Sequence, residues 1–214
     1  MKKLILLTTL VFLSSITFTF AQQEVVDRSA NIIRQFRTMP ERNIPRSVLR
    51  NARGLAIISV VKAGFIFSGR GGKGVVVART RHGWSGPSFI GTGGAGWGAQ
   101  IGAEVTDFVF VLNNDAAVRA FSRGTNVTLG GDVSAAAGPV GRTAEASVTP
   151  KAAVYTYSRS KGLFAGASLE GAVVATLKGQ NEQYYRRPVT ADGILRGRVS
   201  PPPYASSLRA ALGR

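Results

Sequence analysis

The stretch Leu55-Ala56-Ile57-Ile58-Ser59-Val60-Val61 decides the fold class of this sequence, because it is a short β-branched run that is apolar at consecutive positions. Two further runs, Gly74–Ala78 and Val105–Leu112, have the same character. Successive side chains of a strand point to opposite faces of its sheet, so strands of this kind need cover on both faces. The sequence therefore predicts a sheet or barrel-like body that is buried partly beneath helices.

Turn residues separate these runs from three more predicted strands, at Gly64–Phe67, Ala152–Tyr157 and Leu163–Leu177. Apolar spacing predicts short helices at Asn114–Phe121, Ala191–Leu195 and Ser206–Leu212. We expect the α+β class: a compact antiparallel sheet or barrel-like body, with N-terminal amphipathic helices and short C-terminal helices packed around it.

The segment before the first strand is helical by pattern. Between Glu24 and Thr38 the apolar residues recur at helical spacing, at Val26, Ala30, Ile33 and Phe36. This amphipathic helix should stop near Met39-Pro40, because a residue that precedes proline is pushed out of the helical region. A second predicted helix begins at Pro45 and continues through Ala52.

Composition removes much enzymology and leaves a strong positive charge. The chain has no cysteine and one histidine, so we expect no thiolate metal site, no iron–sulfur cluster, no cysteine nucleophile and no histidine-rich metal centre. We therefore expect neither a metal nor a cofactor. The 27 Lys and Arg residues against 11 Asp and Glu give a net charge of +16, which favours an anionic partner.

The basic residues near the amino end are the first candidates for contact with that partner. Arg42, Arg46, Arg50 and Arg53 follow one another at intervals of four, four and three, and would form one ridge if the second helix extends far enough. We predict that six arginines of this region face anionic lipid head groups: Arg34, Arg37, Arg42, Arg46, Arg50 and Arg53.

A glycine-rich motif supplies the second set. Gly69–Gly74 has the letters of a dinucleotide-binding G-x-G-x-x-G, as has Gly91–Gly96, but a strand-like run follows the first where that fold needs a helix. We predict instead a tight turn that presents Arg70 and Lys73 beside exposed backbone N–H groups, which together can hold a phosphate. Lys62 completes the predicted lipid-binding residues.

Catalytic interpretations are weaker. Gly83–Pro87 approaches the G-x-S-x-G elbow, but Pro87 replaces the closing glycine, and His82 is the only imidazole available to Ser85. Glu104 and Asp107 would lie on opposite faces of a strand, where structural hydrogen bonding is expected. We predict no catalytic residues, although an enzyme that uses these groups and an envelope or outer-membrane β protein stay open as alternatives.

The amino terminus has the order of a Sec-type signal peptide. Lys2 and Lys3 precede an apolar stretch, and the segment ends in Thr19-Phe20-Ala21. Retention of Leu4–Phe20 as an anchor is the alternative. We expect a leader at 1–21, a helix and linker at 22–44, and one domain at 45–214. A secreted or periplasmic protein of this charge would meet anionic membrane lipids rather than nucleic acid.

Several ordered motifs carry a family resemblance. Ala52–Ile58, Val61–Phe65, Gly71–Arg79, Gly83–Ser88, Gly98–Val109, Ala137–Arg142 and Tyr157–Gly166 resemble, in this order, the SYLF lipid-binding domain, also described as the yeast actin-binding-type domain. The resemblance covers about Pro45 to Leu212. Lys62 falls on the family's Lys-x-Gly-Phe motif, and Arg70–Gly74 on its glycine turn.

The resemblance implies a non-catalytic module that binds phosphoinositides or other acidic phospholipids. It also implies an antiparallel α+β fold and membrane contact aided by an N-terminal amphipathic helix. Fungal relatives bind and bundle actin, so an actin partner enters by family analogy alone. For an exported chain the expected function narrows to reversible binding of anionic phospholipid surfaces through a basic patch.

Overall fold

The structure, a computed structural model, describes residues 21–39, 44–64, 67–97, 102–139, 152–162 and 172–213. The predicted leader at 1–21 thus lies almost wholly outside the described residues, as does Arg42. An N-terminal helix occupies residues 21–38 and ends where Met39-Pro40 predicted. The strands and helices that follow it confirm the predicted α+β class.

Within the described residues, nine strands form one curled, almost wholly antiparallel sheet, a half-barrel, in the order β6-β9-β4-β2-β1-β5-β8-β7 with β3 paired to β2. Only β7 and β8 pair in parallel. The strands are β1 (Gly54–Gly64), β2 (Phe67–Thr80), β3 (Gly83–Trp84), β4 (Ser88–Trp97), β5 (Gly102–Leu112), β6 (Val127–Thr128), β7 (Ala135–Ala137), β8 (Val154–Gly162) and β9 (Val173–Thr176).

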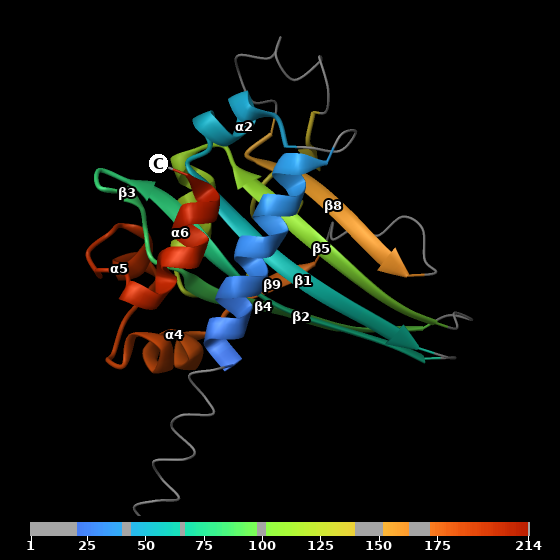
Figure 1. Cartoon of the computed structure of the whole chain (residues 1–214). Helices are drawn as coiled ribbons and strands as arrows, with labels where there is room; N and C mark the ends of the chain where they lie inside the picture. The colour runs from blue at the N-terminus through green and yellow to red at the C-terminus, as the bar shows by residue number, and fades with distance from the viewer. Residues whose placement is uncertain are drawn as a thin grey trace, which may run out of the picture.

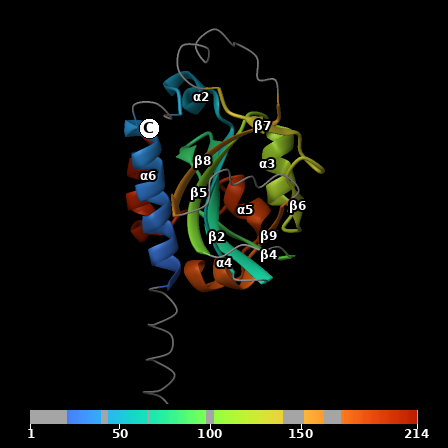
Figure 2. The same cartoon turned by 90° about the vertical axis from the view of Figure 1, so that its right-hand side faces the viewer.

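Helices cover both faces of this sheet. The helices are α2 (Arg46–Asn51), α3 (Asp115–Ser122), α4 (Lys178–Tyr185), α5 (Ala191–Leu195) and α6 (Ser206–Leu212), with a 3-10 turn at Pro203–Ala205. Figure 1 shows the N-terminal helix and α6 side by side in front of the sheet. In the view turned by 90°, these two helices lie on one side of the sheet and α3 and α5 on the other (Figure 2).

The stretch that predicted the fold is the central strand. β1 pairs along its whole length with β2 on one side and β5 on the other. Its apolar residues divide between two core clusters: Leu55 and Ile57 pack under the N-terminal helix and α6, whereas Ala56 and Ile58 pack beneath α3. The prediction that consecutive apolar runs are buried on both faces is thereby confirmed.

The predicted turn at Gly69–Gly74 is wrong. These residues lie inside β2, where Gly71 and Gly72 pair with Val61 and Val60 of β1. Gly74 explains why the sequence carries glycine there: a Cβ atom would lie 1.9 Å from the carbonyl oxygen of Ile57 on the neighbouring strand. Gly74 therefore lets two strand backbones approach closely, which is a known role of glycine in strands.

Other predicted boundaries shift. Gly64–Phe67 is no separate strand, because β1 ends at Gly64 and β2 begins at Phe67. Of the predicted strand Leu163–Leu177, the described part contains only β9, and residues 163–171 lie outside the described residues. The described residues also contain elements that were not predicted: β3, β4, β6, β7 and α4. β4 and α4 were missed because Gly91–Gly94 and Gly179–Gln183 carry few apolar residues in a recognisable period, whereas β3, β6 and β7 are only two or three residues long.

Candidate functional site

The predicted arginines of the N-terminal helix are exposed and hold α6. Arg37 Nη1 donates to the carbonyl oxygen of Ala211 at 2.7 Å, and Arg34 Nη2 to that of Ser207 at 3.4 Å. Arg34 also donates to the Asn31 side chain at 2.6 Å. Carbonyl oxygens in the last turn of a helix lack intrahelical partners, and Ala211 lies in the last turn of α6, so the Arg37 guanidinium satisfies part of that need.

The predicted basic ridge on the second helix is shorter than expected. Arg46 and Arg50 are exposed on α2, which ends at Asn51, and Ala52 has extended backbone angles. Arg53 therefore leaves the helix and lies 3.8 Å from the carboxylate of Asp115 on α3, with both side chains largely exposed. The four-residue ridge that ended at Arg53 is not formed.

The remaining predicted residues lie toward the other end of the sheet. Lys62 on β1 is directly opposite Arg70 on β2, and Lys73 follows on the same strand. At ~3.3 Å per residue, Lys62 is roughly 26 Å along β1 from Gly54, which follows Arg53. The structure thus brings Lys62 and Arg70 together but separates them from Arg53 and from the α2 arginines.

A different basic cluster surrounds the gap between α3 and α5. Two cavities, of about 640 and 870 Å³, adjoin there and share Arg119, Ser122 and Arg196 in their linings. We call this region the arginine cleft and define it by the charged side chains of both linings. Its basic residues are Arg53, Arg79, Arg81, Arg119, Arg123, Lys178, Arg196 and Arg198, and its acidic residues are Asp115 and Asp192.

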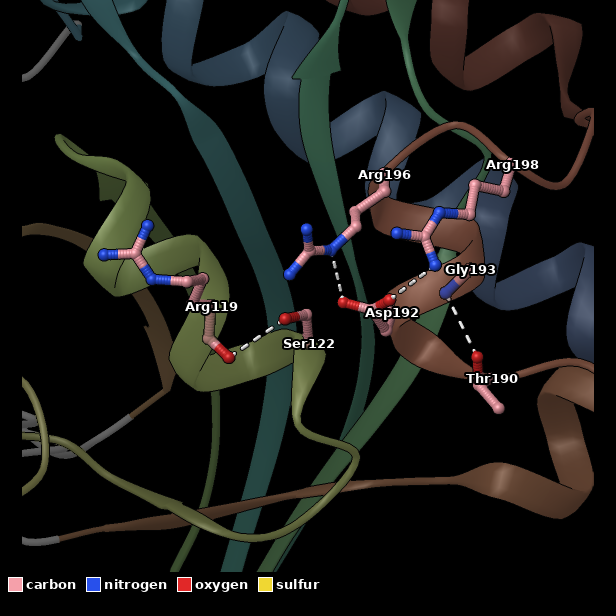
Figure 3. A network of polar contacts seen from close by, with 7 residues as sticks. All are labelled: Arg119, Ser122, Thr190, Asp192, Gly193, Arg196 and Arg198. Atoms are coloured by element: carbon pink, nitrogen blue, oxygen red, sulfur yellow. Dashed lines mark hydrogen bonds and ion pairs between the residues drawn. The ribbon is translucent and has the colours of Figure 1, made fainter.

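The α5 turn positions one wall of the arginine cleft. The Thr190 side chain caps α5 by accepting from the backbone N–H of Gly193 at 3.1 Å. Gly197 adopts a φ of +71°, in the left-handed region that favours glycine, and the chain reverses there. As a result Arg196 and Arg198 both turn back to the same carboxylate, that of Asp192 (Figure 3).

The contacts of Asp192 are specific. Its Oδ1 accepts from Arg196 Nε at 2.5 Å, and its Oδ2 accepts from Arg198 Nη1 at 3.3 Å. The Asp192 side chain is 35% exposed, whereas those of Arg196 and Arg198 are 52% and 65% exposed. The carboxylate is therefore more enclosed than the two guanidinium groups that hold it.

The facing wall comes from α3. Asn114 caps this helix by accepting from the backbone N–H of Ala117 at 2.8 Å, and Phe121 anchors its apolar side in the core. Ser122 donates to the carbonyl oxygen of Arg119 at 3.0 Å. Figure 3 shows Ser122 between α3 and Asp192, with its hydroxyl turned to the Arg119 carbonyl oxygen, while the Arg119 guanidinium extends away from the Asp192 carboxylate.

Arg79 lines the cleft from β2. Its guanidinium lies 4.1 Å from the centre of the Trp84 ring, in a cation–π contact, and partial burial lowers the pKa of Arg79. Arginine remains protonated at neutral pH even so. Trp84 is buried in the core with Phe89.

The catalytic alternatives find little geometric support. Ser85 is buried, and its hydroxyl donates to the carbonyl of Gly86 at 2.8 Å and accepts from the N–H of Ala78, while His82 is exposed. Glu104 and Asp107 have the expected structural partners: Thr106 donates to Glu104 at 3.0 Å, and Arg159 pairs with Asp107 at 2.6 Å. In the described part of the chain, no three His, Asp or Glu residues gather as a metal site would need.

Sequence reasoning missed most of the arginine cleft. Of its eight basic residues, only Arg53 was among the predicted lipid-binding residues. The others come from β2, the β2–β3 turn, α3, α4 and the α5 turn, and no local pattern links these segments. The one available signal was the spacing Asp192, Arg196 and Arg198, which places an acid and an arginine one helical turn apart.

Comparisons with known proteins agree with this fold. A model of the family described as "Ysc84: Las17-binding protein actin regulator" matches residues 93–214. "LAS seventeen-binding protein 3" and "Protein YSC84" of Saccharomyces cerevisiae are each 52% identical over 170 residues, which are 77% of this chain and 37% and 36% of those proteins.

The human "SH3 domain-containing YSC84-like protein 1" is 47% identical over 189 residues, 85% of this chain and 55% of that protein. The chain thus spans between 36% and 55% of the length of these relatives. Because the family model covers more than half of the chain, this protein belongs to the Ysc84 family of SYLF domains.

Proposed function

We propose that this protein is a non-catalytic module that binds anionic phospholipid head groups at a membrane surface, and that the arginine cleft is its head-group site. The observation that carries the proposal is the imbalance of charge there: eight basic side chains and two carboxylates line the adjoining cavities. Each basic residue near an anionic membrane contributes on the order of 1 kcal/mol, so a few acting together give useful affinity.

Guanidinium chemistry suits the ligand. Arginine presents N–H donors in a planar fork that matches two oxygens of one phosphate, and the hydrogen bonds are charge-assisted. Seven of the eight basic residues of the cleft are arginines. The binding should weaken with added salt, because exposed charges are screened within about 10 Å at 0.1 M.

The N-terminal helix supports a charge-based attachment. The resemblance implied that an amphipathic helix aids membrane contact, but here Val26, Ala30, Ile33 and Phe36 are buried against the sheet. An apolar face that is already packed is not available to lipid. Among the described residues no helix combines the length and the hydropathy of a membrane span.

Vesicle sedimentation tests the site with two variants of equal charge. Arg119→Gln/Arg196→Gln removes two charges from the arginine cleft, and Arg46→Gln/Arg50→Gln removes two from α2, among the residues predicted from sequence. At ~1 kcal/mol per residue, we expect the cleft variant to bind anionic vesicles about thirtyfold more weakly. The α2 variant should stay within about fivefold, because Arg46 and Arg50 do not line the arginine cleft and act only as separate surface charges.

Three results would count against the proposal: equal binding of the wild-type protein to neutral and anionic vesicles, indifference to salt, or a larger loss in the α2 variant. The last would return the site to the surface predicted from sequence. Circular dichroism of both variants separates loss of binding from loss of folding.

We further propose export, which rests on the order of charge, apolar stretch and Ala21 at the amino end. Fractionation of the source cells with amino-terminal sequencing tests it, and a cytoplasmic protein that begins at Met1 would contradict it. An actin-related protein partner is the second candidate, because the matching family is described as an actin regulator. Co-sedimentation with filamentous actin tests that candidate.

A further inference from the structure

We propose that Asp192 is the specificity-determining residue of the arginine cleft, and that it makes the cleft select phosphomonoesters over phosphodiesters. The inference rests on the proposed function, because it assumes that the cleft receives the phosphate of the ligand. It adds the chemical class of that phosphate and the residue that discriminates.

Asp192 is a tethered competitor for the ligand. Its two carboxylate oxygens already accept hydrogen bonds from Arg196 and Arg198, at 2.5 and 3.3 Å. A covalently attached group has a high effective concentration at its site, of millimolar order for short flexible tethers. An incoming anion must therefore either displace this carboxylate or bind beside its negative charge.

The charge of the ligand decides that competition. A phosphodiester, as in phosphatidylglycerol, carries one negative charge, so exchanging it for the carboxylate gains no charge. A phosphomonoester, as in phosphatidic acid, carries about −1.5 to −2 at pH 7 and offers three strong acceptor oxygens. Only the monoester gains both charge and hydrogen bonds when Asp192 gives way.

The second acid of the cleft is too loosely held to act in this way. Asp115 lies 3.8 Å from Arg53, and the two side chains are 71% and 61% exposed. Asp192 is half as exposed and has two arginine partners. Asp115 is therefore a matched control: its removal changes the charge of the same cleft without releasing Arg196 or Arg198.

The test compares two kinds of vesicle with the same zeta potential, one containing phosphatidic acid and the other phosphatidylglycerol. Since one extra negative charge a few ångströms from a cation strengthens the attraction even at an exposed site, we expect wild-type protein to prefer phosphatidic acid about tenfold. Asp192→Asn should bind phosphatidylglycerol about tenfold more tightly and so lose the preference. Asp115→Asn should keep it.

A second arm distinguishes a lipid from a free phosphate. Titration with soluble glycerol 3-phosphate, a monoester, and with dimethyl phosphate, a diester, shows whether the head-group phosphate is recognised without a bilayer. Competition by the monoester alone supports the selection and makes the phosphate itself the ligand. Competition by neither, with the vesicle preference intact, supports selection of a phosphomonoester at a lipid surface.

The two proposals fail separately. If wild-type protein binds both anionic vesicles equally, or if Asp192→Asn keeps the preference or weakens binding to both lipids, Asp192 is not the discriminator, although the cleft still binds anions. If wild-type protein binds neither vesicle, the proposed function fails with it. Asp192→Ser, which removes the same charge with a smaller side chain, guards against a folding defect particular to Asp192→Asn.

Discussion

At the scale of single residues, glycine carries the main lesson. Gly69–Gly74 has the composition of a turn, and sequence reasoning placed a turn there, yet the residues continue β2. Glycine is favoured both where φ is positive and where two backbones approach closely, and the two needs look alike in sequence. Only the pairing of β2 with β1 and β4 separates them.

The close approach at Gly74 gives a stability prediction. Because a Cβ atom would lie 1.9 Å from the Ile57 carbonyl oxygen, Gly74→Ala must push β1 and β2 apart, and we expect it to lower the free energy of unfolding by at least about 2 kcal/mol. At Gly71 a Cβ atom would meet nothing within 4 Å, so Gly71→Ala should change stability little. Urea denaturation of both variants measures the difference, and equal midpoints would refute the packing argument.

Gly197 is required for its backbone conformation and not for a close approach of two strands. Its φ of +71° is needed for conformation, and the turn it permits brings Arg198 back to Asp192. We expect Gly197→Ala to cost about 1–2 kcal/mol of unfolding free energy and to weaken binding to anionic vesicles. At Gly179, in α4, an added Cβ atom would meet nothing within 4 Å, so Gly179→Ala should be neutral or slightly stabilising. Urea unfolding and vesicle binding of both variants test this account. Equal stability and equal binding of Gly197→Ala and Gly179→Ala would contradict it.

At the scale of elements, prediction succeeded where local signals were complete. The bounds predicted for Ala191–Leu195 and Ser206–Leu212 are those of α5 and α6. Each has apolar residues at helical spacing. Thr190 is the N-cap residue of α5, and Pro203 begins the 3-10 turn that precedes α6. By contrast β4 was missed, because Gly91, Gly93 and Gly94 interrupt the β-branched pattern on which strand prediction depends.

The cap of α3 links an element to the site. Asn114 satisfies the N–H of Ala117, so Asn114→Ala should destabilise the protein by about 1 kcal/mol. Asn114→Asp keeps an accepting oxygen and should retain most of the stability. Because α3 holds Arg119 and Arg123 at the arginine cleft, the alanine variant should also bind anionic vesicles less tightly. Identical thermal midpoints for the alanine and aspartate variants would show that the cap contributes nothing.

At the scale of the whole molecule, a buried tyrosine cluster makes stability depend on pH. Burial, followed by the charge of neighbouring tyrosines, raises the pKa of Tyr157, Tyr184 and Tyr185 well above the ordinary value of 10. Above pH 10 the unfolded chain releases tyrosine protons that the folded protein retains. Stability is therefore fully present below pH 10 and falls as the pH rises, by up to ~1.4 kcal/mol per unit for each tyrosine.

Urea unfolding at pH 8, 10 and 11 measures this fall, and Tyr184→Phe is its control. The Tyr184 hydroxyl has no hydrogen-bond partner among the described atoms. The phenylalanine variant should thus match the wild-type protein at pH 8 and lose less stability at pH 11. A midpoint that does not change up to pH 11 would contradict the argument.

The arginine cleft also belongs to the whole molecule, which is why sequence could not predict it. The net charge indicated an anionic partner, and the arginines near the amino end were the local group chosen from the sequence. The cleft instead collects Arg79, Arg119 and Arg196 from a strand and two helices far apart in the chain. Their proximity depends on sheet order and on how α3 and α5 cover one face (Figure 2).

The claim that the arginine cleft receives phosphate is tested most directly by NMR of the arginine Nε–Hε groups during titration with vesicles that contain phosphatidic acid. Our account predicts that the signals of Arg119, Arg196 and Arg198 shift first and saturate together. Shifts confined to Arg34, Arg37, Arg46 and Arg50, with the cleft signals unchanged, would contradict it.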